Sequence, residues 1–248
     1  MNDDLEHGRA SFLTTRWSLV LAAGGKGEAD SRAALETLCA TYWYPLYAYV
    51  RRKGHDADAA RDLVQEFFAR LLEREDFARA DPARGRFRAY LLTALKHFLI
   101  NEREREHADK RGGGRKVLPL EFGAHDAETR FSLEPATHDA PDKAFDRAWA
   151  LIVLQRALDR LGSEQRAAGK AEEWQKLQPH LTTAEDAAPY SALAGELGKT
   201  ENAIKITVHR LRKRYGELLR EEIADTLNTD DVDAELATLF DALSGPPA

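Results

Sequence analysis

Residues 190–215 read YSALAGELGKTENAIKITVHRLRKRY, and this stretch is the most informative about the fold of the C-terminal half. The pattern predicts two helices joined by a turn at Gly198, because glycine tolerates a positive φ. Thr200 is placed to cap the second helix, and Glu201 lies in its first turn, where the helix dipole favours an acid. One buried stripe is predicted on the second helix from Ile204, Val208 and Leu211. The segment therefore predicts a helix-turn-helix.

The remaining faces of the second helix are basic. They carry Lys205, His209, Arg210, Arg212, Lys213 and Arg214. A helix that is apolar on one side and cationic on the others has the shape and charge to enter the major groove of DNA. An ordinary amphipathic helix pair with a solvated charged face is the alternative interpretation of this segment.

Charge is segregated along the 248-residue chain, whose formal net charge is −6. Residues 84–116 contain ten Lys or Arg and four acids, and residues 205–220 contain six Lys or Arg and one acid. By contrast, residues 221–241 contain eight acids and no Lys or Arg. Because phosphate responds to the local field, the two basic segments predict two separate contacts with nucleic acid.

Several classes of protein are disfavoured by composition. Cys39 is the single cysteine, which leaves no intrachain disulfide and no thiolate metal cluster. The longest apolar run, residues 148–154, is far shorter than the roughly 20 residues of a membrane span. The N-terminus starts with acids and lacks the basic-then-apolar order of a signal peptide. We therefore expect a soluble, cytoplasmic protein without a metal or a cofactor.

Helical periodicity dominates the chain. Besides the helix-turn-helix, helices are expected at residues 16–23, 32–52, 56–73, 87–106, 144–161, 164–180 and 230–243. Residues 112–142 open with three glycines and contain three prolines, which is typical of a linker, although Phe122, Phe131 and Leu133 indicate that it lies along another surface. The predicted fold class is all-α, with two helical domains joined by a flexible linker.

Two of these helices carry side chains that could bind a partner protein or nucleic acid. The helix at 58–72 has a polar strip formed by Asp58, Asp62, Gln65 and Glu66. This strip is either a solvated face or a docking face for a basic partner helix. The helix at 87–106 combines rings that stack on bases, an amide that reads base edges and cations that neutralise phosphate. These residues are Phe87, Tyr90, Lys96, His97, Phe98, Asn101, Arg103 and Arg105, with Phe98 also interpreted as core.

The chain resembles a bacterial sigma factor of the sigma-70 family, most closely the small two-domain extracytoplasmic-function (ECF) group. The resemblance rests on the order of DLVQEFF at 62–68, FRAYLLTALKHFLINEREREHADKR at 87–111, a loose linker and AIKITVHRLRKRY at 203–215, and it covers about residues 31–220. It implies a non-enzymatic protein that binds core RNA polymerase and promoter DNA, recognises the −35 element as duplex and melts the −10 element.

The resemblance also implies domain boundaries. It gives an N-terminal extension at 1–30, a region 2-like domain at 31–111, a linker at 112–143, a region 4-like helix-turn-helix domain at 144–220 and an acidic helical extension at 221–248. The extension either packs on the second domain or covers the basic recognition helix and suppresses free DNA binding.

Site residues follow from the resemblance by position. The residues implied to bind core polymerase are Asp62, Gln65 and Glu66. Contact with the −10 element falls on Tyr90, Lys96, His97, Asn101, Arg103 and Arg105. Contact with the −35 element falls on Thr200, Asn202, Lys205, Ile206, His209, Arg210 and Arg212.

The sequence departs from the family pattern at three places. His97 stands where Asn is frequent, and Ile206 stands where a small polar residue is common, so an apolar contact with a thymine methyl becomes possible there. Residues 163–189 are longer and more irregular than the usual lead-in to the helix-turn-helix.

Other functions would account for part of this pattern. A helix-turn-helix regulator acting without core polymerase would usually dimerise, whereas the sigma interpretation predicts a monomer when free, with an anti-sigma factor or a regulatory kinase as a candidate controlling partner. A sigma-like interaction protein that has lost promoter melting is a further alternative. An enzyme is disfavoured, because Leu193 stands where a phosphate-binding loop ending at Lys199 would need glycine.

Overall fold

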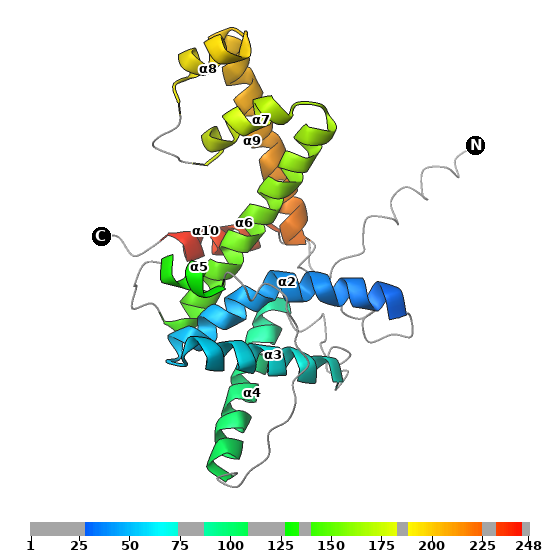
Figure 1. The fold of residues 1–248 in the computed structure, drawn as a ribbon, viewed down its shortest axis with the longest axis vertical. Coiled ribbons are helices and arrows are strands. Elements are labelled where there is room, and N and C mark those ends of the chain that lie inside the picture. The colour runs from blue at the N-terminus through cyan, green and yellow to red at the C-terminus, as the bar shows by residue number, and fades with distance from the viewer. Residues whose placement is uncertain are drawn as a thin grey trace, which may run out of the picture. The chain divides into compact units, whose positions relative to one another are not determined.

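A computed structural model of the chain describes residues 28–73, 87–108, 127–133, 140–182, 188–224 and 232–244. Within these ranges the regular elements are helices (Figure 1), which confirms the predicted all-α class. In chain order they are α2 (Glu28–Arg52), α3 (Ala57–Glu73), α4 (Phe87–Ala108), α5 (Ala127–Leu133), α6 (Pro141–Ala167), α7 (Ala171–Leu177), η3 (Gln178–His180), α8 (Tyr190–Leu197), α9 (Glu201–Ala224) and α10 (Val232–Leu243). The helix expected at 16–23 lies outside the described residues.

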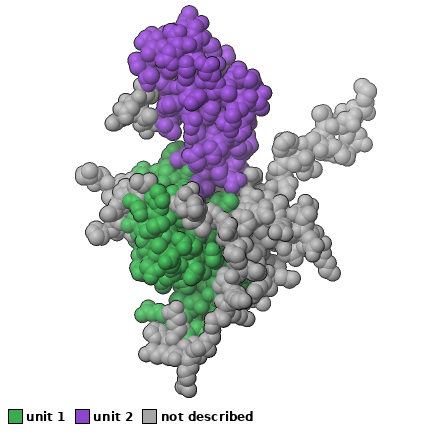
Figure 2. All heavy atoms as spheres, viewed as in Figure 1, with its two compact units in different colours: residues 1–151, 223–248 green, residues 152–222 purple. Residues whose placement is uncertain are grey.

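The chain divides into two compact units, coloured separately in Figure 2. Unit 1 comprises residues 1–151 and 223–248, and unit 2 comprises residues 152–222. The division falls inside α6 and close to the end of α9. The chain therefore leaves unit 1 once and returns to it once, so that the C-terminal residues belong to the same unit as the N-terminal helices.

The core of unit 1 is aromatic. Helix α2 contacts α3 and α5, and α3 contacts α4. The large side chains in the C-terminal part of α2 are buried, including Tyr42, Leu46 and Tyr49. The Tyr42 ring meets Phe87 of α4 edge-on at a centroid distance of 5.3 Å. Large rings with a polar tip give much buried area at one defined geometry, so these contacts fix how α2 and α4 cross.

Helix α5 lies inside the segment predicted as a linker and packs on α2. Glu128 accepts hydrogen bonds from Arg51 at 3.1 and 2.8 Å and one from the Tyr47 hydroxyl. Burial and the bond to Glu128 raise the pKa of Tyr47 to about 12. The Phe131 ring lies 4.8 Å from the Arg51 guanidinium, which confirms that Phe131 lies along another surface. Phe122 lies outside the described residues, and the side chain of Leu133 is not described.

Helix α10 is held in unit 1 by an ion pair with the buried Arg88. Arg88 of α4 lies 2.6 Å from Asp146 of α6 and 3.1 Å from Glu235 of α10. Its guanidinium also lies 4.4 Å from the centroid of the Trp149 ring. The sequence predicts that the acidic tail either packs on the second domain or covers the recognition helix. The structure shows the Glu235 carboxylate of α10 paired with Arg88 of unit 1, and the effect of the tail on DNA binding stays a prediction.

Unit 2 is built on the second part of α6, together with α7, α8 and α9. The helix expected at 164–180 is interrupted: α6 ends at Ala167, Gly169 has a φ of +72°, and α7 starts at Ala171. A left-handed residue ends a helix, which explains the break. Trp174 of α7 returns against α6 at Gly162, where an added Cβ would lie 2.9 Å from the indole Nε1.

Candidate nucleic-acid interface

The turn of the helix-turn-helix has the geometry that its sequence predicts. Gly198 ends α8 with a φ of +62°, and the Lys199 N–H donates to the Ala194 carbonyl at 3.0 Å. The Thr200 hydroxyl accepts a hydrogen bond from the Ala203 N–H at 3.2 Å, which satisfies a donor of the first turn of α9. The left-handed glycine and the threonine cap are therefore both confirmed.

Helix α9 separates an apolar face from an exposed one. Ile204, Val208 and Leu211 are buried, as predicted. The residues predicted to meet the −35 element are exposed along the first three turns: Asn202, Lys205, Ile206, His209 and Arg210. Ile206 has 45% of its surface exposed, which is unusual for an isoleucine. The side chain of Lys205 pairs with Glu201, one turn earlier, at 2.6 Å.

Arg212 differs from the other predicted DNA contacts, because its guanidinium is bound within unit 2. Its Nε and Nη2 donate to the backbone carbonyl of His180 at 3.2 and 2.8 Å. The His180 ring is buried and lies 4.8 Å from the Tyr190 ring. Burial, with the Arg212 charge as the second cause, lowers the pKa of His180 below its usual 6.5. Arg212 thus links the recognition helix α9 to η3.

One cation of α9, Arg214, is matched by several carboxylates. Arg214 bonds Glu164 of α6 at 3.0 and 2.7 Å, and it also reaches Glu217 and Glu221. The hydrogen bond to Glu164 is the main cause of the raised pKa of Arg214. This neutralisation weakens the positive field beyond Lys213.

In unit 1, the residues predicted to meet the −10 element gather on α4. His97 and Asn101 are exposed and lie one turn apart on the same face. Tyr90, two turns before His97, is half-buried, with its ring centroid 6.2 Å from that of Phe87. Ile100 beside them has 55% of its surface exposed. Phe98 points the other way and is buried against Phe67, so the interpretation of Phe98 as core is confirmed.

The three cations of α4 that are predicted to meet the −10 element have different surroundings. Lys96 pairs with Asp142 at 2.7 Å. Arg105 lies 3.1 Å from Glu102 and 3.9 Å from Glu66. Arg103 is exposed, and within the described part of the chain it has no ion-pair partner. Arg103 is therefore the cation of α4 with the least neutralised charge.

The residues of the polar strip of α3 also differ in their surroundings. Asp62 is exposed and Gln65 is half-buried. Glu66 pairs with Arg70 at 2.5 Å, and Arg70 pairs with Glu102 of α4 at 2.6 Å. Glu66 thus takes part in a network that joins α3 to α4, while Asp62 presents its carboxylate to solvent.

Comparison with protein families identifies this part of the chain. The model described as sigma-70 region 2 matches residues 41–108, which include α3, α4 and the C-terminal part of α2. Residues 41–108 are therefore similar to sigma-70 region 2, and they are called region 2 here. The polar strip of α3 and the exposed face of α4 both lie in region 2.

A second comparison extends beyond region 2. The chain is 22% identical over 181 residues to the RNA polymerase sigma factor YlaC of Bacillus subtilis (strain 168), a match that covers 73% of this chain and 89% of that protein. Together with region 2, this match confirms the predicted resemblance to an ECF-like sigma factor of the sigma-70 family. This family is not a class of enzymes. The search of solved structures gives no significant match.

Two further findings concern ligands and membranes. Within the described ranges, His, Cys, Asp and Glu side chains form no group of three that could hold a metal ion. None of the described helices combines the length and the apolar character that crossing a bilayer requires.

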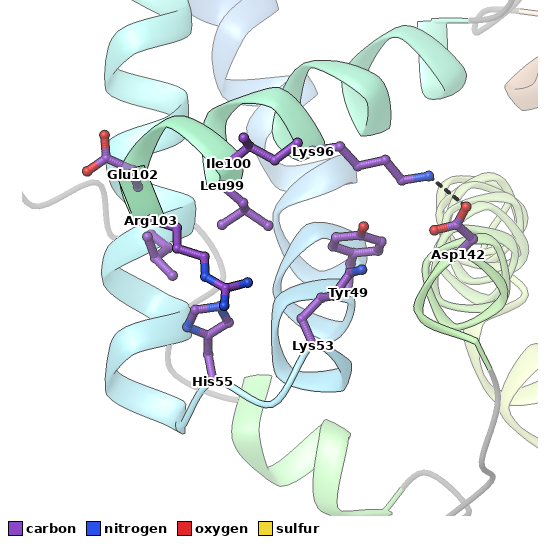
Figure 3. Close-up of a pocket in the computed structure, with 10 residues that line it drawn as sticks. Tyr49, Lys53, His55, Lys96, Leu99, Ile100, Glu102, Arg103 and Asp142 are labelled. Carbon is purple, nitrogen blue, oxygen red and sulfur yellow. Dashed lines mark hydrogen bonds and ion pairs between the residues drawn. The ribbon is translucent and has the colours of Figure 1, made fainter. Parts of the chain in front are cut away.

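One part of region 2 was missed by sequence reasoning. Lys53 and His55, in the connection between α2 and α3, lie with Lys96 and Arg103 around a groove (Figure 3). The signal in the sequence is the basic run Arg51-Arg52-Lys53 before Gly54, which ends a helix in the middle of region 2. Arg51 is bound to Glu128, so the run alone does not indicate which of its cations faces solvent.

Proposed function

We propose that the chain is a sigma factor that binds core RNA polymerase and directs promoter-specific initiation of transcription. In this proposal, residues 31–111 are the region 2-like domain, which opens the −10 element, and residues 144–220 are the region 4-like domain, which reads the −35 duplex. The observation that carries the proposal is the presence, in one chain, of a sigma-70 region 2 and a separate compact unit that contains a capped helix-turn-helix.

The chemistry of α4 supports a role at the −10 element. Opening a duplex requires groups that hold unstacked bases, since extruding one base costs about a few kcal/mol. His97 and Asn101 offer hydrogen-bonding groups on one exposed face, and Tyr90 offers part of a ring. Lys96, Arg103 and Arg105 lie on the same helix for phosphate contact.

The chemistry of α9 supports a role at the −35 element. Thr200 and Asn202 lie at its N-terminus, where backbone N–H groups and the helix dipole favour a phosphate. Lys205, His209 and Arg210 are exposed on the following turns, where a recognition helix contacts base edges. We assign the exposed Ile206 to apolar contact with a thymine methyl group, and Arg212 to positioning α9 through the His180 carbonyl.

Binding to the polymerase is assigned to Asp62, Gln65 and Glu66 of α3. Asp62 is the exposed acid, so we expect it to make the dominant electrostatic contact, while Glu66 orients the strip through Arg70. Core RNA polymerase and promoter DNA are thus the proposed partners, and the proposed place of action is the cytoplasm.

The test of this assignment is association with core polymerase measured by analytical size exclusion. The wild-type chain is expected to run as a monomer alone and to comigrate with core. An Asp62→Ala, Gln65→Ala double variant is expected to comigrate less, whereas His209→Ala, a change in the proposed −35 face, is expected to comigrate as the wild type does. A tight dimer that ignores core would overturn the proposal and favour a helix-turn-helix regulator that acts without polymerase.

A further inference from the structure

A short segment of unit 2, formed by α7 and η3, contacts the helix-turn-helix through two ion pairs. Glu173 of α7 accepts a hydrogen bond from Lys199, in the turn between α8 and α9, at 2.5 Å. Lys176, one turn later on α7, lies 3.2 Å from Glu196 of α8. One pair therefore places the acid on α7, and the other places the cation there. A register that exchanged the partners would bring like charges together, so the two pairs favour one placement of α7 against α8 and the turn.

Helix α7 carries these charges on a fixed support. Trp174 and Leu177 are buried, and the Trp174 indole packs against α6 at Gly162. The Trp174 N–H also donates to the Lys170 carbonyl at 2.8 Å. Apolar burial thus holds α7 to the rest of unit 2. Because this support does not depend on the ion pairs, the removal of one charge should alter the helix-turn-helix without unfolding α7.

Helix α9 is anchored by this segment at two points. Lys199, which is bound to Glu173, immediately precedes the cap Thr200. Arg212 donates to the His180 carbonyl of η3 at 3.2 and 2.8 Å. The exposed residues that are proposed to read the −35 duplex lie between these two points: Asn202, Lys205, Ile206, His209 and Arg210. Because such side chains bind well only when supporting contacts hold them in place, the segment is suited to set the position of the recognition face.

The pair with Glu173 also determines what Lys199 is free to bind. Lys199 is the neighbour of Thr200, which is proposed to contact phosphate at the N-terminus of α9. A contact with phosphate strengthens binding to every duplex and carries no sequence information. Only 16% of the Glu173 side chain is exposed, so water screens this pair less than it screens the exposed ion pair in the first turns of α9.

We propose that Glu173 is a specificity-determining residue for the −35 element, which acts by holding Lys199 at the start of α9 and away from phosphate. Glu173 is a positioning residue in this role, because it acts through Lys199 and not on DNA directly. The inference rests on the proposed sigma function. It gives a role to part of residues 163–189, the stretch that departs from the family pattern, since α7 supplies the carboxylate.

The test uses the holoenzyme assembled from the full chain and core polymerase. Two duplexes of equal length are compared, one with the −35 element of a promoter that the wild-type holoenzyme transcribes and one of random sequence. Glu173→Gln removes the charge that holds Lys199. Binding to the random duplex should strengthen, with a slope of log K against log salt steeper by about 0.9, the value for one added phosphate contact on a duplex. The preference for the −35 duplex should fall about two- to five-fold, the range expected for one partly exposed ion pair.

Two further variants separate the effect of pairing from a loss of structure. The control Glu172→Gln removes an acid whose pair with Lys176, at 3.4 Å, lies within α7, so this variant should keep the wild-type preference. The double variant Glu173→Lys, Lys199→Glu restores the pair with the opposite polarity. It should recover the wild-type preference and the wild-type salt slope.

The inference is overturned if Glu173→Gln keeps the wild-type preference. It is also overturned if Glu173→Gln weakens binding to both duplexes equally and lowers the melting temperature, because Glu173 would then only stabilise the fold. A double variant that discriminates no better than Glu173→Gln would contradict it too, because Lys199 would then act without its partner. A wild-type holoenzyme that prefers no promoter duplex over the random one would instead reject the proposed function itself.

Discussion

Arg88 of α4 and Glu235 of α10 form a buried ion pair, with 3.1 Å between Nη2 and Oε1 and with 8% and 1% of their side chains exposed. Arg88 belongs to region 2, whereas Glu235 belongs to the acidic C-terminal extension. The second carboxylate on Arg88, Asp146 at 2.6 Å, comes from α6. Three helices far apart in the sequence therefore converge on one guanidinium.

Loss of the Glu235 carboxylate is expected to destabilise unit 1. Breaking a buried pair from one side costs about 3–5 kcal/mol, and we expect Glu235→Ala to fall at the lower end because Asp146 still faces Arg88. Hydrogen exchange of the α4 and α6 amides would measure the loss. The control is Asp241→Ala, an exposed acid of the same helix, for which a change within about 0.5 kcal/mol is expected. Equal effects of the two changes would show that α10 is not held by this pair.

Gly162→Ala should destabilise unit 2. The added Cβ would lie 2.9 Å from Nε1 and 3.1 Å from Cε2 of Trp174, so the indole or the α6 backbone must move. Overpacking of this kind costs about 1–3 kcal/mol, which exceeds the roughly 0.5–1 kcal/mol that alanine gains over glycine within a helix. Thermal unfolding is the measurement. Gly216→Ala, in α9 with open space around its Cβ, should raise the melting temperature, and a rise for both variants would contradict the packing argument.

The stability of unit 2 should fall as the pH drops below about 6.5. Burial lowers the pKa of His180 in the folded state, so below its usual pKa of 6.5 the unfolded state binds the proton more readily. The stabilisation is complete above pH 6.5 and is lost as the pH falls towards the lowered pKa of the folded state. Unfolding in denaturant at pH 7.5 and at pH 5.5 measures this loss.

Two substitutions test the assignment of that pH dependence to His180. His180→Phe keeps an aromatic ring beside Tyr190 but cannot be protonated, so its stability should change less between the two pH values. His209→Gln, on the exposed face of α9, should retain the wild-type loss. If His180→Phe loses as much stability as the wild type, the pH dependence has another origin.

Arg210 and Arg212 lie half a turn apart on α9 and should respond differently to truncation. Arg210 is exposed, so Arg210→Ala should weaken holoenzyme binding to −35 duplex by about 1–3 kcal/mol, with little change in affinity for core. Arg212 is bound to the His180 carbonyl, so Arg212→Ala should lower the stability of unit 2 as well. Electrophoretic shift and thermal unfolding separate the two effects. Equal stability losses would remove the distinction between contact and positioning.

Local features of the sequence predicted most of the helices and the helix-turn-helix. The apolar spacing of Ile204, Val208 and Leu211 and the cap at Thr200 depend on residues within a few turns, and these predictions are confirmed. The ends of the helices were less accurate: α6 starts at Pro141, inside the predicted linker.

Contacts between distant residues could not be predicted in this way. Periodicity indicates that Glu235 lies on a helix, but it does not indicate that Arg88 is its partner. The glycines and prolines of residues 112–142 indicate a linker. The sequence does not indicate that Glu128, inside this segment, binds Tyr47 and Arg51 on α2. The roles assigned to the site residues remain predictions, since they depend on polymerase and DNA.

The most direct test of the central claim is run-off transcription with purified core polymerase from the same bacterium and a library of its genomic promoters. If the chain is a sigma factor, core alone should give no specific start sites, and adding the chain should produce discrete transcripts from promoters that share −35 and −10 elements. The same pattern of transcripts with and without the chain would contradict the claim.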